Sequence, residues 1–294
     1  MSELDEFWER PDVHPYIDRA QAAMEADDFD AELRVWDELV AKFPDAYGAW
    51  SARGLCLEKL RRWDDALAAF RRSTKIHPNY PDHYNAATML LNLGRDAEAL
   101  EELDASLALD ETYAEAWCNR GIALTKLGRP EEAATSFERA QKADPELSNA
   151  YRCHAILLGQ MGERDRAAKL RARVAELEPE SSSAHLEYAQ ALADAHDDHY
   201  VHWEPGGIED QIVEILDRAL ALPCNSDQHR YAWAEKLRRL QRIAHGRQAT
   251  RRAGLAVDDA PAIARFRKDA EEAVKLFDGD QYFADKLLDA KSLG

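Results

Sequence analysis

Residues 115–145 read EAWCNRGIALTKLGRPEEAATSFERAQKADP, and their apolar and small side chains recur at the spacing of an α-helix. Gly128 suits a turn between two helices because positive φ costs little only for glycine. Pro145 ends the second helix because proline cannot continue one. The stretch therefore predicts two short antiparallel helices joined by a turn. Its anchor residues are Trp117, Gly121, Leu124, Gly128, Ala133, Phe137 and Pro145.

A second stretch, residues 48–78, places similar residue types in the same order and reads GAWSARGLCLEKLRRWDDALAAFRRSTKIHP. In both stretches a small residue on the first helix is expected to meet a small residue on the second, Gly54 with Ala66 in this copy, so that the backbones approach closely. Large aromatic side chains then fill the space on either side. Because these aromatic residues recur at packing positions, we interpret them as core rather than as a cofactor site. The anchors of this copy are Trp50, Gly54, Leu57, Trp63, Ala66, Phe70 and Pro78.

These stretches resemble the tetratricopeptide repeat, whose pattern over roughly 34 residues is W-x2-L-G-x2-Y, then A-x3-F, then P. The departures are arginine where the pattern has leucine, at Arg53 and Arg120, and leucine where it has tyrosine, at Leu57 and Leu124. Three partial copies continue the register on both sides. They use Tyr16, Ala20, Ala23, Phe29, Trp36 and Pro44; then His83, Ala87, Leu90, Gly94, Ala99 and Leu103; then Tyr151, Ala155, Leu158, Gly162, Ala167, Arg171 and Pro179.

The resemblance implies an all-α fold, a right-handed superhelical solenoid of helix–turn–helix units with a helical C-terminal cap. Five repeats are predicted over residues 13–181, and a degenerate sixth repeat over 182–225. The sixth repeat carries an inserted loop at about 195–207, where a regular unit would continue. Residues 226–294 hold three amphipathic segments that we expect to cap the end of the solenoid.

Composition limits the classes of function. The chain of 294 residues has a formal net charge of −18, which disfavours general nucleic-acid binding because the field repels phosphates. The sequence has no readable secretory signal and no apolar run that could span a bilayer, so we expect a soluble cytoplasmic protein with no membrane partner.

The cysteines are too widely separated for a disulfide framework or a zinc ribbon, which suits a reducing compartment. They are Cys56, Cys118, Cys153 and Cys224.

A concave groove lined by the first helix of each repeat is the candidate binding site that the resemblance implies. Family members often bind the ligand backbone through an asparagine two residues after the signature aromatic, a place that Asn85 and Asn119 hold here. Alternatively, these amides bond to neighbouring helices or water. The predicted groove residues are Ser51, Leu55, Tyr84, Asn85, Thr88, Asn119, Ile122, Lys126, Arg152 and Ile156, with Cys118 beside them.

The groove composition favours one kind of ligand. Some family members clamp a C-terminal carboxylate with a lysine-asparagine-lysine-arginine set. Ser51 and Leu55 stand where the first lysine and asparagine of that set belong, so recognition of a chaperone tail is not predicted. An amphipathic helix or an apolar peptide fits the mixed apolar and polar lining better.

The inserted loop reads DAHDDHYVHWEPGG over residues 194–207 and is the second candidate site. Its histidines His196, His199 and His202 recur every three residues among carboxylates, which suits zinc, nickel or copper. The spacing matches no fixed ligand signature, however. The alternatives are a specificity rim, in which Tyr200, His202 and Trp203 pack on the edge of the array or overhang the groove, and an inert surface loop.

A basic segment at residues 236–252, KLRRLQRIAHGRQATRR, contains no acidic residue. This segment either binds an acidic partner or nucleic acid, or forms a helix whose charged face balances the acidic charge of the repeats. We favour the second interpretation.

The sequence shows no hydrolase, phosphate-loop or zinc-protease motif, so no enzyme activity and no resident cofactor are predicted. The expected function is a cytoplasmic adaptor or scaffold that binds a peptide or helix of a partner protein. The main alternative is a metal-binding or catalytic accessory protein that uses residues 194–204. Self-association through exposed ends of the solenoid is a third possibility.

Overall fold

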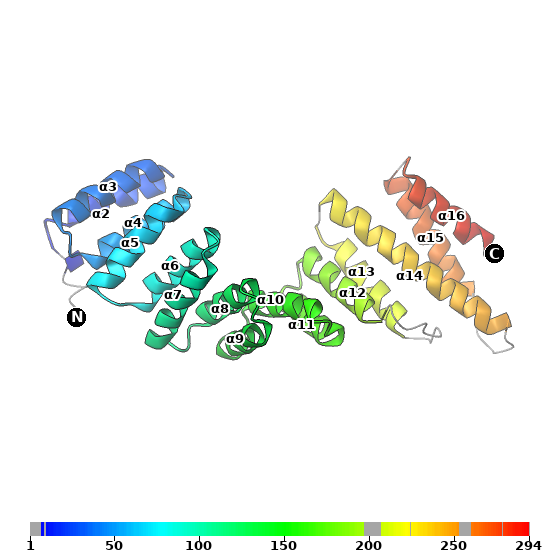
Figure 1. Ribbon diagram of the computed structural model, residues 1–294. Helices are drawn as coiled ribbons and strands as arrows, with labels where there is room; N and C mark the ends of the chain where they lie inside the picture. Colours follow the sequence, from blue (N-terminus) through cyan, green and yellow to red (C-terminus); the bar gives the residue numbers. More distant parts are fainter. Residues whose placement is uncertain are drawn as a thin grey trace. The chain divides into compact units, whose positions relative to one another are not determined.

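The computed structural model describes residues 7, 8, 10–196, 207–223, 225–252, 260–277 and 279–293 (Figure 1). Over these residues the chain contains the helices α2 to α16 and no strand. It divides into two compact units, Met1–Cys153 and His154–Gly294, which are described separately below.

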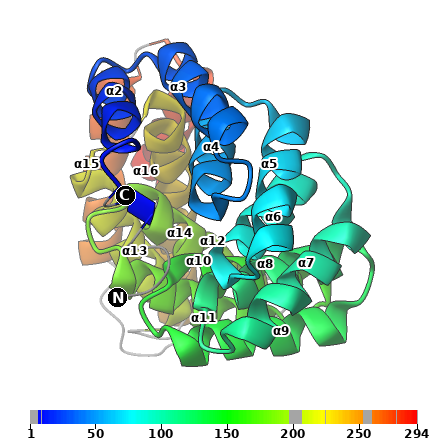
Figure 2. The same cartoon turned by 90° about the vertical axis from the view of Figure 1, so that its left-hand side faces the viewer.

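The first unit is a series of antiparallel helix pairs, and each helix contacts the next one along the chain (Figures 1 and 2). The first turn of α10 (Ser148–Gln160) also belongs to this unit. Each pair corresponds to one predicted copy of the repeat. The helices are α2 (His14–Glu25), α3 (Phe29–Lys42), α4 (Tyr47–Lys59), α5 (Trp63–Ile76), α6 (Tyr80–Asn92), α7 (Asp96–Leu109), α8 (Ala114–Lys126) and α9 (Pro130–Ala143).

The second unit continues with six further helices after the rest of α10. These are α11 (Arg164–Leu177), α12 (Ser182–His196), α13 (Ile208–Ala221), α14 (Ser226–Arg252), α15 (Ala260–Leu276) and α16 (Gln281–Ser292). Consecutive helices from α11 to α16 contact one another. Residues 197–206, most of the predicted insertion between α12 and α13, lie outside the described residues.

The turns inside the helix pairs use the backbone conformation that the sequence predicts. Gly94, Gly128 and Gly162 have φ values of 70°, 72° and 82°, in the left-handed region that favours glycine. The same turn in the two preceding pairs is made by Asp27 and Arg61, which also have positive φ. The prolines at the repeat ends each follow the last residue of a second helix by two positions, at Pro44, Pro78, Pro145 and Pro179.

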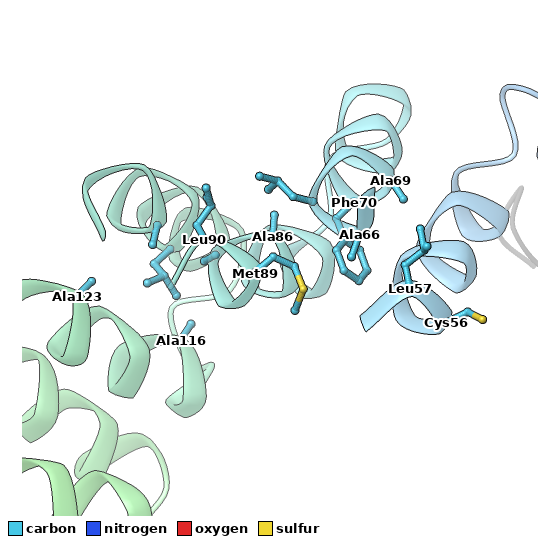
Figure 3. Close-up of a cluster of buried hydrophobic side chains, with 14 of the residues drawn as sticks. Cys56, Leu57, Ala66, Ala69, Phe70, Ala86, Met89, Leu90, Ala116 and Ala123 are labelled. Carbon is cyan, nitrogen blue, oxygen red and sulfur yellow. The ribbon is translucent and has the colours of Figure 1, made fainter. Parts of the chain in front are cut away.

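The core of the first unit rests on a close fit between a glycine and a phenylalanine. A Cβ built on Gly54 would lie 2.6 Å from Cε1 of Phe70, and one on Gly121 would lie 2.5 Å from Cε1 of Phe137. The sequence predicts that Gly54 meets Ala66, and the structure adds that the Phe70 ring lies against the glycine. Figure 3 shows Phe70 among the buried side chains of this cluster, with Leu57 and Met89 nearby.

The two arginines that depart from the repeat pattern make equivalent ion pairs. Arg53 lies over the Trp50 ring and binds Asp37 with a 2.7 Å contact between Nε and Oδ1. Arg120 lies over Trp117 and contacts Asp104 at the same distance. Each aspartate belongs to the second helix of the preceding pair. The arginines therefore connect successive repeats at the position where the family pattern has leucine.

The second unit buries several charged side chains among its apolar core. Lys236, Arg239, Glu235 and Asp269 are buried, and their charges are paired. Phe266 and Phe283 belong to the surrounding apolar cluster.

This arrangement accounts for part of the basic segment 236–252. Arg239 and Arg242 both contact Glu209 on α13, and Arg238 contacts Glu235. These contacts agree with a basic helix face whose charges pair with acidic residues. The side chains of Arg251 and Arg252 lie outside the described residues.

Candidate functional site

The first helices α4, α6 and α8 of the first unit, together with the start of α10, form what we call the first-helix face. Side-chain contacts join each of these helices to the next. Between α4 and α6, Asp82 is buried and accepts hydrogen bonds from Ser51 and from Ser73, the latter at 2.5 Å. Asn79 Nδ2 donates to the same carboxylate at 3.0 Å, while its Oδ1 caps α6 by accepting from the Asp82 amide. The Ser51 hydroxyl therefore forms a hydrogen bond within the contact between α4 and α6.

Between α6 and α8, the contacts involve three of the predicted groove residues. Asn119 Nδ2 donates to Thr88 Oγ1 at 3.4 Å, and the Thr88 hydroxyl donates to the backbone oxygen of Tyr84 at 3.0 Å. Burial raises the pKa of Tyr84, and hydrogen bonds with Thr88 and Asn119 oppose that rise. Asn119 therefore bonds to a neighbouring helix, which is one of the two roles that the sequence leaves open for it.

Three tyrosines form an aromatic cluster at the N-terminal ends of α6 and α8. The Tyr113 ring lies edge-on to Tyr80 and to Tyr84, with centroid distances of 5.2 and 5.0 Å. Burial also raises the pKa of Tyr113, so its phenol is neutral at physiological pH. The cluster presents uncharged rings with polar hydroxyl groups, a composition common in interfaces with peptides and proteins.

Between α8 and α10, one asparagine bridges two thiols. Asn149 Nδ2 donates to Cys118 Sγ at 3.6 Å, and Cys153 Sγ donates to Asn149 Oδ1 at 3.6 Å. Cys118 is buried, whereas Cys153 is half-buried.

The remaining predicted groove residues differ in exposure. Leu55 on α4 exposes 44% of its surface, while Asn85, Ile122 and Arg152 are half-buried. Lys126 is held at the end of α8 by Asp96, at 3.2 Å, and by the backbone oxygen of Leu91. Ile156, also exposed, belongs to the second unit and is described apart from the others.

The structure describes one of the three histidines of the histidine-rich loop. His196 is the last residue of α12, and its Nδ1 lies 2.9 Å from the backbone oxygen of Leu192 in the same helix. His199, His202 and Trp203 lie outside the described residues. No group of three or more potential metal ligands occurs within the part of the chain that is described. The metal and specificity-rim hypotheses for this loop both stay predictions.

Sequence reasoning missed Asp82, Asn149 and Tyr113 as parts of this face. A signal for two of them exists, because the contacts Ser51–Asp82, Thr88–Asn119 and Cys118–Asn149 all join residues 31 positions apart. A polar residue 31 positions after a small polar residue on a first helix therefore marks a contact between successive repeats.

An ion-pair cluster that joins α5, α6 and α7 is expected to make stability depend on pH. Glu102 lies 2.8 Å from His83 Nδ1 and 2.8 Å from Arg71 Nε. Burial raises the pKa of Glu102, but the hydrogen bonds from His83 and Arg71 outweigh burial and leave the pKa below its usual value. A carboxyl group whose pKa is lower in the folded than in the unfolded chain stabilises the folded state at pH values above its unfolded pKa. This stabilisation is lost as the pH falls through the folded pKa.

We expect the Glu102→Gln variant to have a lower Tm than the wild type at pH 7, with the difference narrowing as the pH falls below about 4. Thermal unfolding of both proteins between pH 7 and pH 3 measures this difference. Exposed Glu101 provides a matched control on the same helix, because Glu101→Gln should change Tm little at any pH. A Tm difference for Glu102→Gln that is constant over the range would contradict the interpretation.

None of the helices in the described segments is long and apolar enough to cross a membrane.

Comparison with known proteins agrees with this architecture. Models described as tetratricopeptide repeat match residues 17–81 and 114–147, and a model described as TPR repeat matches residues 88–128. A stack of antiparallel helix pairs with these matches defines a helical-repeat solenoid protein. Residues 17–81 and 88–147 therefore carry tetratricopeptide repeats, and the fold is that of tetratricopeptide repeat solenoids. A search of curated proteins finds no significant match.

Solved structures of repeat proteins share the fold at low sequence identity. The C-terminal part of a TPR repeat-containing protein from Cytophaga hutchinsonii has a TM-score of 0.61 and 16% identity, and the match covers 91% of this chain and 98% of that structure. PilW, a type IV pilus biogenesis factor, has a TM-score of 0.60 and 21% identity, covering 76% and 98%. YrrB, described as a TPR protein with an unusual peptide-binding site, has a TM-score of 0.50 and 20% identity, covering 62% and 96%.

Proposed function

We propose that the chain is a non-enzymatic adaptor or scaffold of the cytoplasm, and that its first-helix face binds a peptide or helix of a partner protein. The observation that carries the proposal is a row of uncharged side chains at one repeat position of three consecutive first helices. Leu55, Thr88 and Ile122 hold the same repeat position on α4, α6 and α8, and each is at least partly exposed. None of these three side chains is ionisable, in a chain whose formal net charge is −18.

The chemistry of this surface favours an amphipathic helix or an apolar peptide. Leu55 and the tyrosine cluster offer apolar area, whose burial on binding is favourable at about 25 cal/mol per Å². Half-buried Asn85 and Asn119 can donate and accept hydrogen bonds at once, which suits a polypeptide backbone. Glu58 on α4 is partly withdrawn from water, and burial raises its pKa. The negative field of the chain also supports the prediction that general nucleic-acid binding is absent.

The family and the YrrB description support peptide binding as a class of function, since the matched repeats are ones that bind polypeptides in other proteins. A peptide on the first-helix face would contact residues from several repeats at once, so truncating one apolar side chain at its centre should have a large effect.

We expect Leu55→Asp to reduce partner binding by more than tenfold, because the charge must be desolvated against an apolar ligand. Affinity capture with mass spectrometry first identifies a partner, and titration calorimetry with its mapped peptide then measures the dissociation constant. Leu109→Asp is the matched control, since Leu109 is 49% exposed but ends the second helix α7.

The asparagines supply a second test of the same proposal. The Asn85→Ala/Asn119→Ala double variant should weaken binding of the mapped peptide, while circular dichroism confirms that it folds. Equal binding by wild type, Leu55→Asp and this double variant would place the ligand elsewhere on the chain.

A further inference from the structure

Two thiols meet at the junction of α8 and α10. Cys118 comes from the first helix of one repeat and Cys153 from the first helix of the next, and both contact the side-chain amide of Asn149 at 3.6 Å. The thiols also contact each other, since a hydrogen bond between Cys118 and Cys153 is the largest cause of the raised pKa of Cys118. Two cysteines on different helices thus lie against the same amide group and within reach of one another.

The two thiols differ in their access to solvent. Cys118 is 2% exposed, and its hydrogen bond with Cys153 together with burial keeps its pKa well above the usual range. Cys153 is only half-buried and is therefore the thiol that a small reagent reaches first. This is the arrangement of an attacking cysteine beside a protected second cysteine, which is typical of redox-sensitive pairs.

Cys56 shows what an isolated buried thiol looks like in the same unit. Its Sγ donates to the backbone oxygen of Phe29 at 3.2 Å, and burial raises its pKa to about 12. It is fully buried, so a peroxide in solution has no direct access to it. Cys56 therefore provides an internal reference for the reactivity of the pair.

We propose that Cys118 and Cys153 are a peroxide-sensitive pair that closes to an intramolecular disulfide between α8 and α10. In the first step the Cys153 thiolate attacks one oxygen of hydrogen peroxide, the O–O bond breaks, and water leaves after protonation, which produces a sulfenic acid. In the second step Cys118 sulfur attacks the Cys153 sulfur, the S–O bond breaks, and a second water leaves with the Cys118 proton. Overall two thiols are oxidised and one hydrogen peroxide is reduced to two waters.

The disulfide would join two successive first helices through a covalent bond. It would replace the two thiol–amide contacts of Asn149 and close a loop between residues 118 and 153. Closing a loop of this length restricts the unfolded chain and stabilises the folded one. The proposal is independent of what the first-helix face binds.

The test uses the full-length chain with Cys224, which lies outside the described residues, replaced by serine in every sample. Dilute protein is treated with hydrogen peroxide, blocked with N-ethylmaleimide under denaturing conditions and digested for mass spectrometry. We expect a Cys118–Cys153 linked peptide that dithiothreitol reverses, an unlinked Cys56 peptide, and a rise in Tm on the order of 5 °C.

Variants separate the steps. Cys153→Ser should abolish the linked peptide and the Tm rise, and Cys56→Ser should leave both unchanged. Cys118→Ser should stop the reaction at a Cys153 sulfenic acid that dimedone traps, which tests the attacking role even if the other variant folds poorly. The proposal is overturned if Cys153 proceeds to sulfinic acid in the wild type while Cys118 stays free, or if disulfides form only between chains.

Discussion

Replacing Lys236 by methionine is expected to destabilise the second unit by about 3–5 kcal/mol, the usual range for a buried ion pair that loses one partner. Lys236 Nζ lies 2.9 Å from Asp269 and 2.8 Å from Asp217. Asp269 is buried on α15, and after the substitution it keeps only a 4.0 Å contact with Arg265 among the ion pairs described. The cost arises because a carboxylate then lies in the core without its closest countercharge.

Chemical unfolding followed by circular dichroism measures the loss, and hydrogen exchange of α14 and α15 peptides assigns it to this unit. Lys268→Met is the control on exposed α15 surface and should change stability by less than about 0.5 kcal/mol. The double variant Lys236→Met/Asp269→Leu should recover most of the loss, because both charges leave together. If Lys236→Met costs no more than Lys268→Met, the pair is not buried in solution as the structure has it.

Replacing Gly121 by valine is expected to destabilise the first unit by about 3 kcal/mol, at the upper end of the range for overpacking a core. A Cβ at this position would lie 2.5 Å from Cε1 and 2.7 Å from Cζ of Phe137. The Phe137 ring is buried, so it has no open space into which to move. Either the ring leaves its rotamer or α8 and α9 separate.

The same substitution at Gly159 is the matched control, because a Cβ built there has no heavy atom within 4 Å apart from the nearby backbone of α10 itself. Gly159→Val should be close to neutral, since valine is a slightly better helix former than glycine. Adding Phe137→Leu to Gly121→Val should restore part of the loss by removing the ring. Equal effects of the two glycine substitutions, measured by urea unfolding, would show that helix propensity rather than packing governs these sites.

Much of the fold could be predicted from sequence because its causes are local. Gly94 and Gly128 mark turns because positive φ depends on the residue itself, and Pro78 marks a helix end for a similar reason. Family resemblance supplies the helix pairing. The contact of Phe70 with Gly54 was harder to predict from the sequence. The spacing shows which residues are small but not which side chain fills the space above them.

The site was less predictable, because its contacts depend on how one repeat lies against the next. Asp82 in the first turn of α6 has the sequence pattern of an ordinary acidic residue near a helix N-terminus, yet it is buried against Ser51 and Ser73. Lys236 lies in a basic run typical of a solvated face, and only the positions of Asp217 and Asp269 show that it is buried.

The contacts between residues 31 positions apart also determine which repeat can follow which. Each junction uses a different chemical pair: a hydroxyl with a carboxylate for Ser51–Asp82, a hydroxyl with an amide for Thr88–Asn119, and a thiol with an amide for Cys118–Asn149. If the repeat containing α6 and α7 were deleted, Ser51 would face the repeat position of Ala116, which has no acceptor side chain. The repeats are therefore alike in fold but not interchangeable, and their order along the chain is encoded in their side chains.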